Sequence, residues 1–236
     1  MSERRDGYER RSGERRSAGW LHPSVLTTIG ALVLAIAGVI FVLSVVLSPP
    51  AEAPYRATGE PYADGLAAYQ RTNYETALAQ WTKGATAGEK RSMKGLGDLY
   101  RLGQGVPADQ GLAMEWYGKA AGQGVPEAQF ELAKLIDARA GNTERVLMDQ
   151  ALYWFKNAAL QYVVEAQYIV ATFHERGRGI RVDLVEAAAW YGFAGSQGHP
   201  QGAAERARLV AGLTEQQRVF VEQRERELVA NVGRGR

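Results

Sequence analysis

The sequence contains no cysteine and only three histidines, His22, His174 and His199. The lack of cysteine excludes disulfides, thiolate catalysis and cysteine-ligated metals. The histidines form no H-x-x-x-H pattern and no cluster with carboxylates that could complete a metal site. We therefore expect neither a metal nor another cofactor.

The sequence also lacks a large excess of either charge, because it has 28 basic and 26 acidic residues and a formal net charge of +2. Residues 1–24 hold six of the arginines and four of the acids, so the rest of the chain is electrically balanced. A balanced chain shows no electrostatic footprint for nucleic acid. Nucleic acid is therefore not an expected partner.

Residues 25–47, "VLTTIGALVLAIAGVIFVLSVVL", carry no charge over 23 positions. About 20 apolar residues cross a bilayer as a helix, so this segment is predicted to be a single transmembrane helix. A secretory signal peptide is the alternative, because Ala51-Glu52-Ala53 resembles a cleavage site. The apolar run is longer than a signal core of roughly 7–15 residues, and Pro54 would begin the mature chain, so we favour the anchor.

Six arginines precede this segment, whereas only Arg56 follows it within about 20 residues. The N-terminus is therefore predicted to stay in the cytoplasm and residues 48–236 to be exported. We expect a disordered Arg-rich tail at 1–24 and a stiff linker with four prolines at 48–61. Within the span, Ala31, Ala35 and Gly38 share one face on which another helix could pack, although small residues are common in membrane helices.

Four tryptophans, Trp81, Trp116, Trp154 and Trp190, recur at intervals of 35, 38 and 36 residues. Around the last three the chain reads "WYGKAAGQGVPEAQ" (116–129), "WFKNAALQYVVEAQ" (154–167) and "WYGFAGSQGHPQGA" (190–203). A period of this length is typical of a helical solenoid. One tryptophan per repeat in a fixed register is expected to belong to the core rather than to a ligand cage.

Upstream of two of the tryptophans, a second phrase recurs without a gap. Gly103-Gln104-Gly105 is followed by Asp109, and Gly177-Arg178-Gly179 by Asp183. Glycine allows a left-handed residue where a helix ends, and aspartate caps the start of the next helix. Each unit is therefore predicted to be a helix, a loop and a second helix.

These residues resemble the Sel-one-like repeat, a longer relative of the tetratricopeptide repeat, in three units at 92–124, 128–162 and 166–198. The resemblance implies an all-α fold: an α-solenoid at 62–213, following the single transmembrane helix, with a degenerate unit at its front. "TEQQ" (214–217) fits a capping box, which predicts a terminal capping helix within 214–236. Val221, Leu228 and Val232 would form the apolar side of that helix.

The sequence offers no set of residues for catalysis. The glycine-rich loops follow no strand and lack the G-x-x-x-x-G-K-[ST] spacing, and no G-x-S-x-G elbow is present. The chain is therefore not expected to be an enzyme. By resemblance, such solenoids bind proteins or peptides.

Candidate contact residues come from first-helix positions that the core pattern does not use: Asp98, Arg101, Glu131, Lys134 and His174. His174 could instead be an exposed residue at a helix end. Arg176, Arg178 and Arg181 could bind an acidic group. Alternatively, these arginines belong to a solvated loop and pair with Glu175 and Asp183.

Three functions remain open at this stage. The first is a membrane-tethered scaffold in the bacterial inner membrane, with the solenoid in the periplasm. The second is an accessory or assembly subunit of an integral membrane complex, docked through the transmembrane helix. The third is a regulator that recruits cell-wall enzymes. The sequence names no partner and does not predict self-association.

Overall fold

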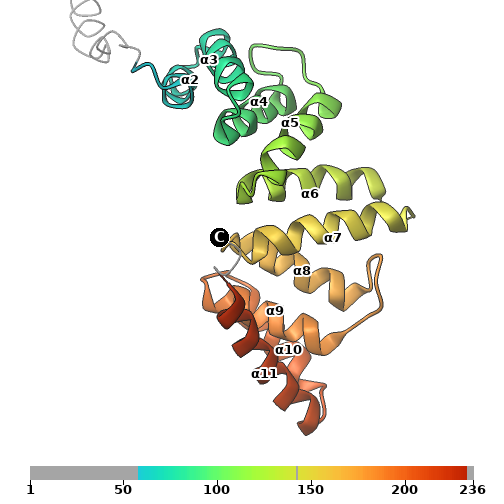
Figure 1. The fold of residues 1–236 in the computed structure, drawn as a ribbon. Helices are drawn as coiled ribbons and strands as arrows, with labels where there is room; N and C mark the ends of the chain where they lie inside the picture. The colour runs from blue at the N-terminus through green and yellow to red at the C-terminus, as the bar shows by residue number, and fades with distance from the viewer. Residues whose placement is uncertain (1–57, 142, 233–236) are drawn as a thin grey trace, which may run out of the picture. The chain divides into compact units, whose positions relative to one another are not determined.

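A computed structural model describes residues 58–141 and 143–232, which belong to one compact unit, Arg56–Arg236. Throughout these residues the regular structure is helical (Figure 1). The helices are α2 (Pro61–Gln70), α3 (Tyr74–Thr86), α4 (Lys90–Leu102), α5 (Gln110–Gly122), α6 (Pro126–Ala140), α7 (Arg145–Ala159), α8 (Val164–Arg176), α9 (Leu184–Ser196), α10 (Gly202–Ala211) and α11 (Glu215–Asn231).

The expected tail at 1–24 and the expected transmembrane helix at 25–47 lie outside the described residues, as does most of the linker at 48–61. Ala31, Ala35 and Gly38 therefore stay a sequence-based prediction. Within the described ranges, no helix is long and apolar enough to cross a membrane.

Consecutive helices pair as hairpins, α2 with α3, α4 with α5, α6 with α7 and α8 with α9. The second helix of each hairpin packs on the first helix of the next, which produces the stack in Figure 1. The described unit is therefore an α-solenoid, as the repeat predicted.

The loops within the hairpins have the predicted cap chemistry. Gly103 and Gly177 end α4 and α8 in the left-handed region, at φ 68° and 66°. The Asp109 carboxylate accepts a hydrogen bond from the backbone N–H of Leu112 at 2.9 Å, and Asp183 accepts two from the start of α9. These caps fix where α5 and α9 begin.

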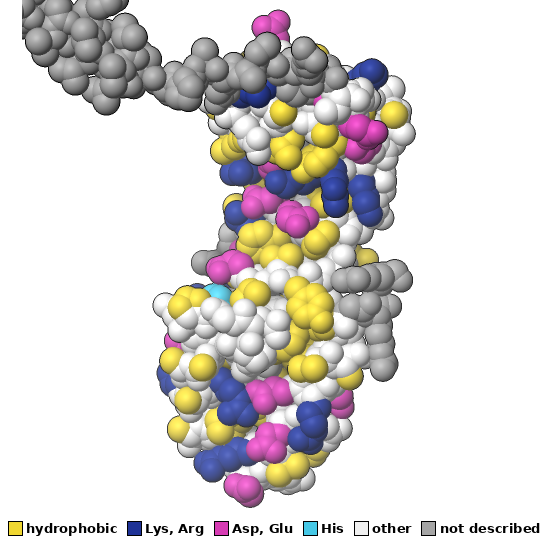
Figure 2. Space-filling model, turned by 90° about the vertical axis from the view of Figure 1, so that its left-hand side faces the viewer, with side chains coloured by type: hydrophobic (Ala, Val, Ile, Leu, Met, Phe, Trp, Pro, Cys, Tyr) yellow, Lys and Arg dark blue, Asp and Glu magenta, His cyan; other side chains and the backbone are white. Residues whose placement is uncertain are grey.

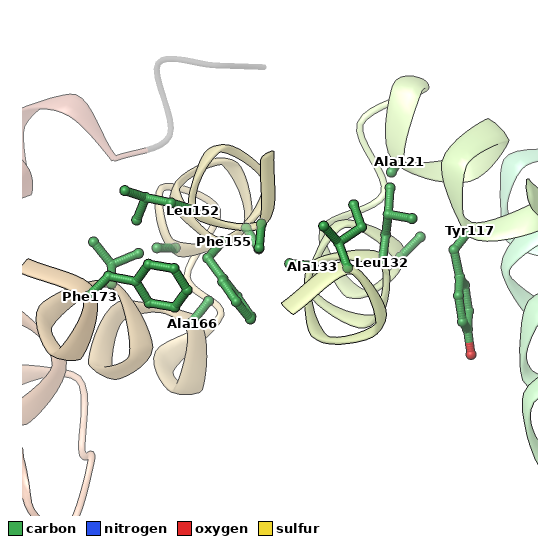
Figure 3. Close-up of a cluster of buried hydrophobic side chains, with 14 of the residues drawn as sticks. Tyr117, Ala121, Leu132, Ala133, Leu152, Phe155, Ala166 and Phe173 are labelled. Carbon is green, nitrogen blue, oxygen red and sulfur yellow. The ribbon is translucent and has the colours of Figure 1, made fainter. Parts of the chain in front are cut away.

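The core consists of alanines and of the aromatic residue that follows each later tryptophan. Tyr117, Phe155 and Tyr191 are at most 2% exposed, and Figure 3 shows Tyr117 and Phe155 among buried alanine and leucine side chains. The tryptophans themselves differ from expectation. Trp81 and Trp190 are buried, whereas Trp116 and Trp154 are half-buried and pack on the edge of the core.

Two buried glutamines join neighbouring repeats. Gln129 Nε2 donates to the carbonyl of Ala121 at 3.2 Å, and Gln167 Nε2 donates to the carbonyl of Ala159 at 3.1 Å. Both glutamines occupy the same register near the start of a first helix. Each one adds a second donor to a carbonyl at the C-terminal end of the preceding second helix, which also accepts from the backbone N–H of Gly124 or Tyr162 in the loop that follows.

The last helix closes the stack. Thr214 and Gln217 form the predicted capping box at the start of α11. Val221, Leu228 and Val232 are buried, as expected, and both α10 and α11 pack on α9. Two further contacts hold α11 in place: Arg224 Nε donates to Glu186 of α9 at 2.8 Å, and Arg206 of α10 pairs with Glu225 of α11.

Replacing Gly97 by alanine tests the close packing inside a hairpin. A Cβ at this position of α4 would lie 2.5 Å from ring carbons of the buried Tyr117. We expect Gly97→Ala to lower the free energy of unfolding by about 1–3 kcal/mol, measured by urea denaturation.

The matched control is Gly118→Ala on α5, where a Cβ meets no atom within 4 Å and φ is not positive. Alanine favours a helix, so this change should raise the free energy of unfolding by about 0.5–1 kcal/mol. A loss of stability of the same size in both variants would contradict the packing argument.

Candidate functional site

Four of the residues predicted as partner contacts come together in one group on α4 and α6. Together with Lys94 they form a group that we call the charged strip, which consists of Lys94, Asp98, Arg101, Glu131 and Lys134. Lys94 Nζ lies 2.7 Å from Asp98 Oδ2, Arg101 Nε lies 3.6 Å from Glu131 Oε2, and Lys134 Nζ lies 3.1 Å from Glu131 Oε1. The charges alternate, so each member has an opposite charge beside it.

Tyr117 of α5 forms hydrogen bonds to two residues of the charged strip. The Tyr117 hydroxyl donates to Asp98 Oδ1 at 2.7 Å and accepts from Arg101 Nε at 3.1 Å. Burial, with the Asp98 charge and hydrogen bond, raises the pKa of Tyr117 against the opposing effect of Arg101. Tyr117 therefore stays protonated and orients the carboxylate of Asp98.

His174 does not lie at the surface. Its side chain is 9% exposed, and its two ring nitrogens have no hydrogen-bond partner among the described residues. Burial lowers its pKa, with a further contribution from the positive charge of Lys156. The expected exposed contact residue is thus a neutral core histidine near the end of α8, and that prediction was wrong.

The three loop arginines have different environments. Arg178 pairs with Asp137 of α6 at 2.8 Å, donates to the Gly141 carbonyl at 3.0 Å and lies over the Phe173 ring at 5.0 Å. It therefore holds the loop after α8 against the preceding repeat. Arg176 and Arg181 are exposed.

The expected partners of these arginines have other roles. Glu175 accepts from the Tyr191 hydroxyl at 2.7 Å and pairs with Arg208 of α10. Asp183 caps α9. The alternative in which the loop arginines pair with Glu175 and Asp183 is therefore replaced by the Arg178–Asp137 pair.

A hollow of about 510 Å³ opens beside the charged strip, at the N-terminal ends of α2, α4 and α6. We call it the basic hollow. Its lining residues are Tyr62, Lys90, Arg91, Lys94, Gly124, Val125, Pro126 and Glu127. It belongs to the edge formed by the loops between hairpins, which faces the viewer in Figure 2, where Lys and Arg side chains lie in a band in the upper half and again, among Asp and Glu, in the lower half.

Positive charge dominates the basic hollow. Lys90 and Arg91 are exposed in the first turn of α4, which has no acidic residue, and the Arg91 guanidinium lies 5.7 Å from the centre of the Tyr62 ring. Lys94 forms an ion pair with Asp98, which partly offsets its charge. Glu127 is the single carboxylate among the lining residues.

Sequence analysis missed the basic hollow, although one signal was present. Arg91 stands in the register at which the next two repeats carry Glu127 and Glu165. A reversal of charge at one repeat position marks that repeat as different. Only the fold shows that Tyr62 and the loop before α6 border the same space.

In the parts of the chain that the structure covers, no three His, Cys, Asp or Glu side chains come together as a metal site. The geometry instead presents charged side chains at one edge of a stack of helices. The fold and its site therefore define a helical-repeat solenoid with a charged edge.

Comparison with known proteins specifies the repeat. Residues 90–125, 126–162 and 164–199 each match the model of the Sel1 repeat, and these spans coincide with the hairpins α4–α5, α6–α7 and α8–α9. Residues 90–199 thus match three consecutive Sel1 repeats, in agreement with the resemblance seen in the sequence. A Sel1 repeat protein from Oxalobacter formigenes has a similar structure, with a TM-score of 0.50, 27% identity and coverage of 56% of this chain and 97% of that one.

Two curated proteins are also similar. An exopolysaccharide production negative regulator of Rhizobium leguminosarum bv. viciae is 28% identical over 148 residues, which are 58% of this chain and 55% of that protein. An uncharacterized protein of Neisseria meningitidis serogroup B is 32% identical over 123 residues, 50% of this chain and 25% of that protein. The chain thus spans about half of the first relative and a quarter of the second.

Replacing Tyr117 by phenylalanine tests the support of the charged strip. The ring volume is kept, and the next repeat carries Phe155 at this register, but Asp98 and Arg101 lose their shared hydroxyl. We expect Tyr117→Phe to lower the free energy of unfolding by about 1–3 kcal/mol.

Tyr153→Phe on α7 is the control, because that side chain is 59% exposed and a surface change should stay within about 0.5 kcal/mol. Thermal and urea denaturation of both variants measure the difference. Equal stability of Tyr117→Phe and the unaltered protein would show that the hydroxyl does not support Asp98 and Arg101.

Proposed function

We propose that this protein is a non-catalytic scaffold tethered to the bacterial inner membrane. Residues 25–47 span the membrane, the Arg-rich tail stays in the cytoplasm, and the solenoid binds protein partners in the periplasm. The basic hollow carries this proposal, because three cations line a hollow at an open edge of an array of Sel1 repeats. A stack of short hairpins offers such an edge as an extended binding surface.

A second function is an accessory subunit of an integral membrane complex. The face formed by Ala31, Ala35 and Gly38 favours it, because small residues at this spacing allow close packing of membrane helices. A third function is regulation, for example by recruiting cell-wall enzymes. The name of the Rhizobium relative, a negative regulator of exopolysaccharide production, supports that third function.

The topology can be tested because the chain has no cysteine of its own. Single cysteines are introduced at Ser17 in the tail and at Val182, which is 59% exposed in the loop before α9. In spheroplasts, a membrane-impermeant maleimide should label Val182→Cys without lysis and Ser17→Cys only after lysis. Labelling in the reverse order, or of both residues without lysis, would contradict the proposed orientation.

Partner binding is tested by purifying the tagged full chain from native membranes in mild detergent and identifying co-purifying proteins by mass spectrometry. The scaffold proposal expects periplasmic partners that remain bound when residues 25–47 are replaced by an unrelated apolar helix. Loss of every partner on this replacement would favour the accessory subunit. Recovery of no stoichiometric partner by either chain would contradict both.

A further inference from the structure

Lys90 and Arg91 stand at the wrong end of a helix for their charge. The N-terminus of a helix carries partial positive charge and favours anions. The helices α2, α3, α6, α8, α9, α10 and α11 follow this rule with an acidic residue in their first turn. In α4 the first turn carries two cations and no acid, and the nearest carboxylate in the sequence is that of the N-cap residue Glu89; α5 and α7 also lack an acid in their first turn. Lys90 and Arg91 thus add positive charge to the end of the helix that is already partly positive.

The chain supplies one negative charge at this helix start, the carboxylate of Glu89, which accepts a hydrogen bond from Ser92 Oγ at 2.7 Å. Among the described residues, no carboxylate lies within ion-pair distance of Lys90 or Arg91. Lys94 has its partner in Asp98, and Glu127 is the one acid that lines the basic hollow. Three cations and one carboxylate leave the lining with a formal charge of +2.

The same position is acidic in the neighbouring repeats. Glu127 and Glu165 occupy the register of Arg91 at the starts of α6 and α8. Those glutamates suit the helix dipole, so the repeat architecture does not require a cation there. The cation therefore belongs to this repeat in particular and points to a ligand of opposite charge.

The shape of the site favours a chain segment over a membrane surface. The cations line a hollow of about 510 Å³ between the start of α2, the first turns of α4 and the loop before α6. Volumes of this size admit a few side chains or a small ligand. A planar bilayer meets protruding cations, whereas an extended peptide can place a side chain into a recess. The Tyr62 ring offers an apolar surface for the stem of that side chain.

We propose that the basic hollow binds an acidic segment of a protein partner, and this rests on the scaffold function proposed above. Arg91 takes a Glu or Asp carboxylate with two parallel N–H donors, as a planar guanidinium can. Lys90 adds a mobile positive charge beside it. Lys94 is already held by Asp98 and borders the hollow without moving.

The test measures binding of a fluorescein-labelled peptide of about eight residues, half of them Glu, to the full chain in neutral detergent by fluorescence polarisation. The same peptide with Gln in place of Glu is the reference. We expect the Glu peptide to bind at least about tenfold more tightly, with a difference that shrinks as salt rises. Equal binding of the two peptides would overturn the proposal.

Three variants localise the binding. Arg91→Gln should weaken the Glu peptide about tenfold, because it removes an exposed guanidinium whose loss leaves the fold intact. Glu127→Gln should strengthen binding about twofold to fivefold, because it removes the one carboxylate of the lining. The control is Arg139→Gln, an exposed arginine in the last turn of α6, at the other end of that helix from Pro126. An equal loss in Arg91→Gln and Arg139→Gln would show non-specific attraction and overturn the proposal.

Phosphatidylglycerol mixed into the detergent micelles serves as the competing anion. If it displaces the peptide and its effect disappears in Arg91→Gln, the basic hollow is a lipid site and the proposal is wrong. Failure of the peptide to bind while native partners still co-purify would overturn this inference and leave the scaffold function standing. Peptide binding without any co-purifying partner would support this inference and contradict the scaffold function.

Discussion

The stack depends on aromatic rings that pack directly against the backbone at glycine residues. Tyr117 of α5 lies where a Cβ on Gly97 of α4 would stand, and Trp81 occupies the space beside Gly65 and Gly95 in the same way. Small residues let the helices approach, and a large ring then fills the groove between them, which gives high packing density and a defined register. The same contact supports the charged strip, because the ring that packs on Gly97 carries the hydroxyl that bonds to Asp98 and Arg101.

The sequence was sufficient for features set by local chemistry. The period of the tryptophans indicated the repeat, and the caps at Gly103, Asp109 and Thr214 could be predicted because each depends on residues within one or two turns. The apolar side of α11 followed from helical periodicity alone. Helical spacing places Asp98 beside Arg101 on α4 and Glu131 beside Lys134 on α6, whereas the Arg101–Glu131 pair that joins the two helices depends on how the hairpins stack.

What escaped prediction depends on distant residues. His174 is buried, and the charges that act on its pKa besides burial come from other elements, such as Lys156 of α7, Glu186 of α9 and Arg224 of α11. Arg178 forms its ion pair with Asp137, which is 41 residues away in the sequence, and not with the acids of its own loop. The basic hollow needs α2, α4 and the loop before α6 at once. Which aromatic of each Trp-containing pair is buried likewise depends on how the hairpins meet, so Trp116 and Trp154 stay half-buried while Tyr117 and Phe155 fill the core.

The position of α11 also decides where this array can grow. Because α10 and α11 both pack on α9, the outer surface of the third repeat is already covered. A further hairpin therefore has no free surface of α9 on which to pack. An added repeat would have to enter upstream of α10, where Gln129 and Gln167 at the starts of α6 and α8 connect each repeat to the one before it. The length of the charged edge is thus limited by the two helices that cover α9.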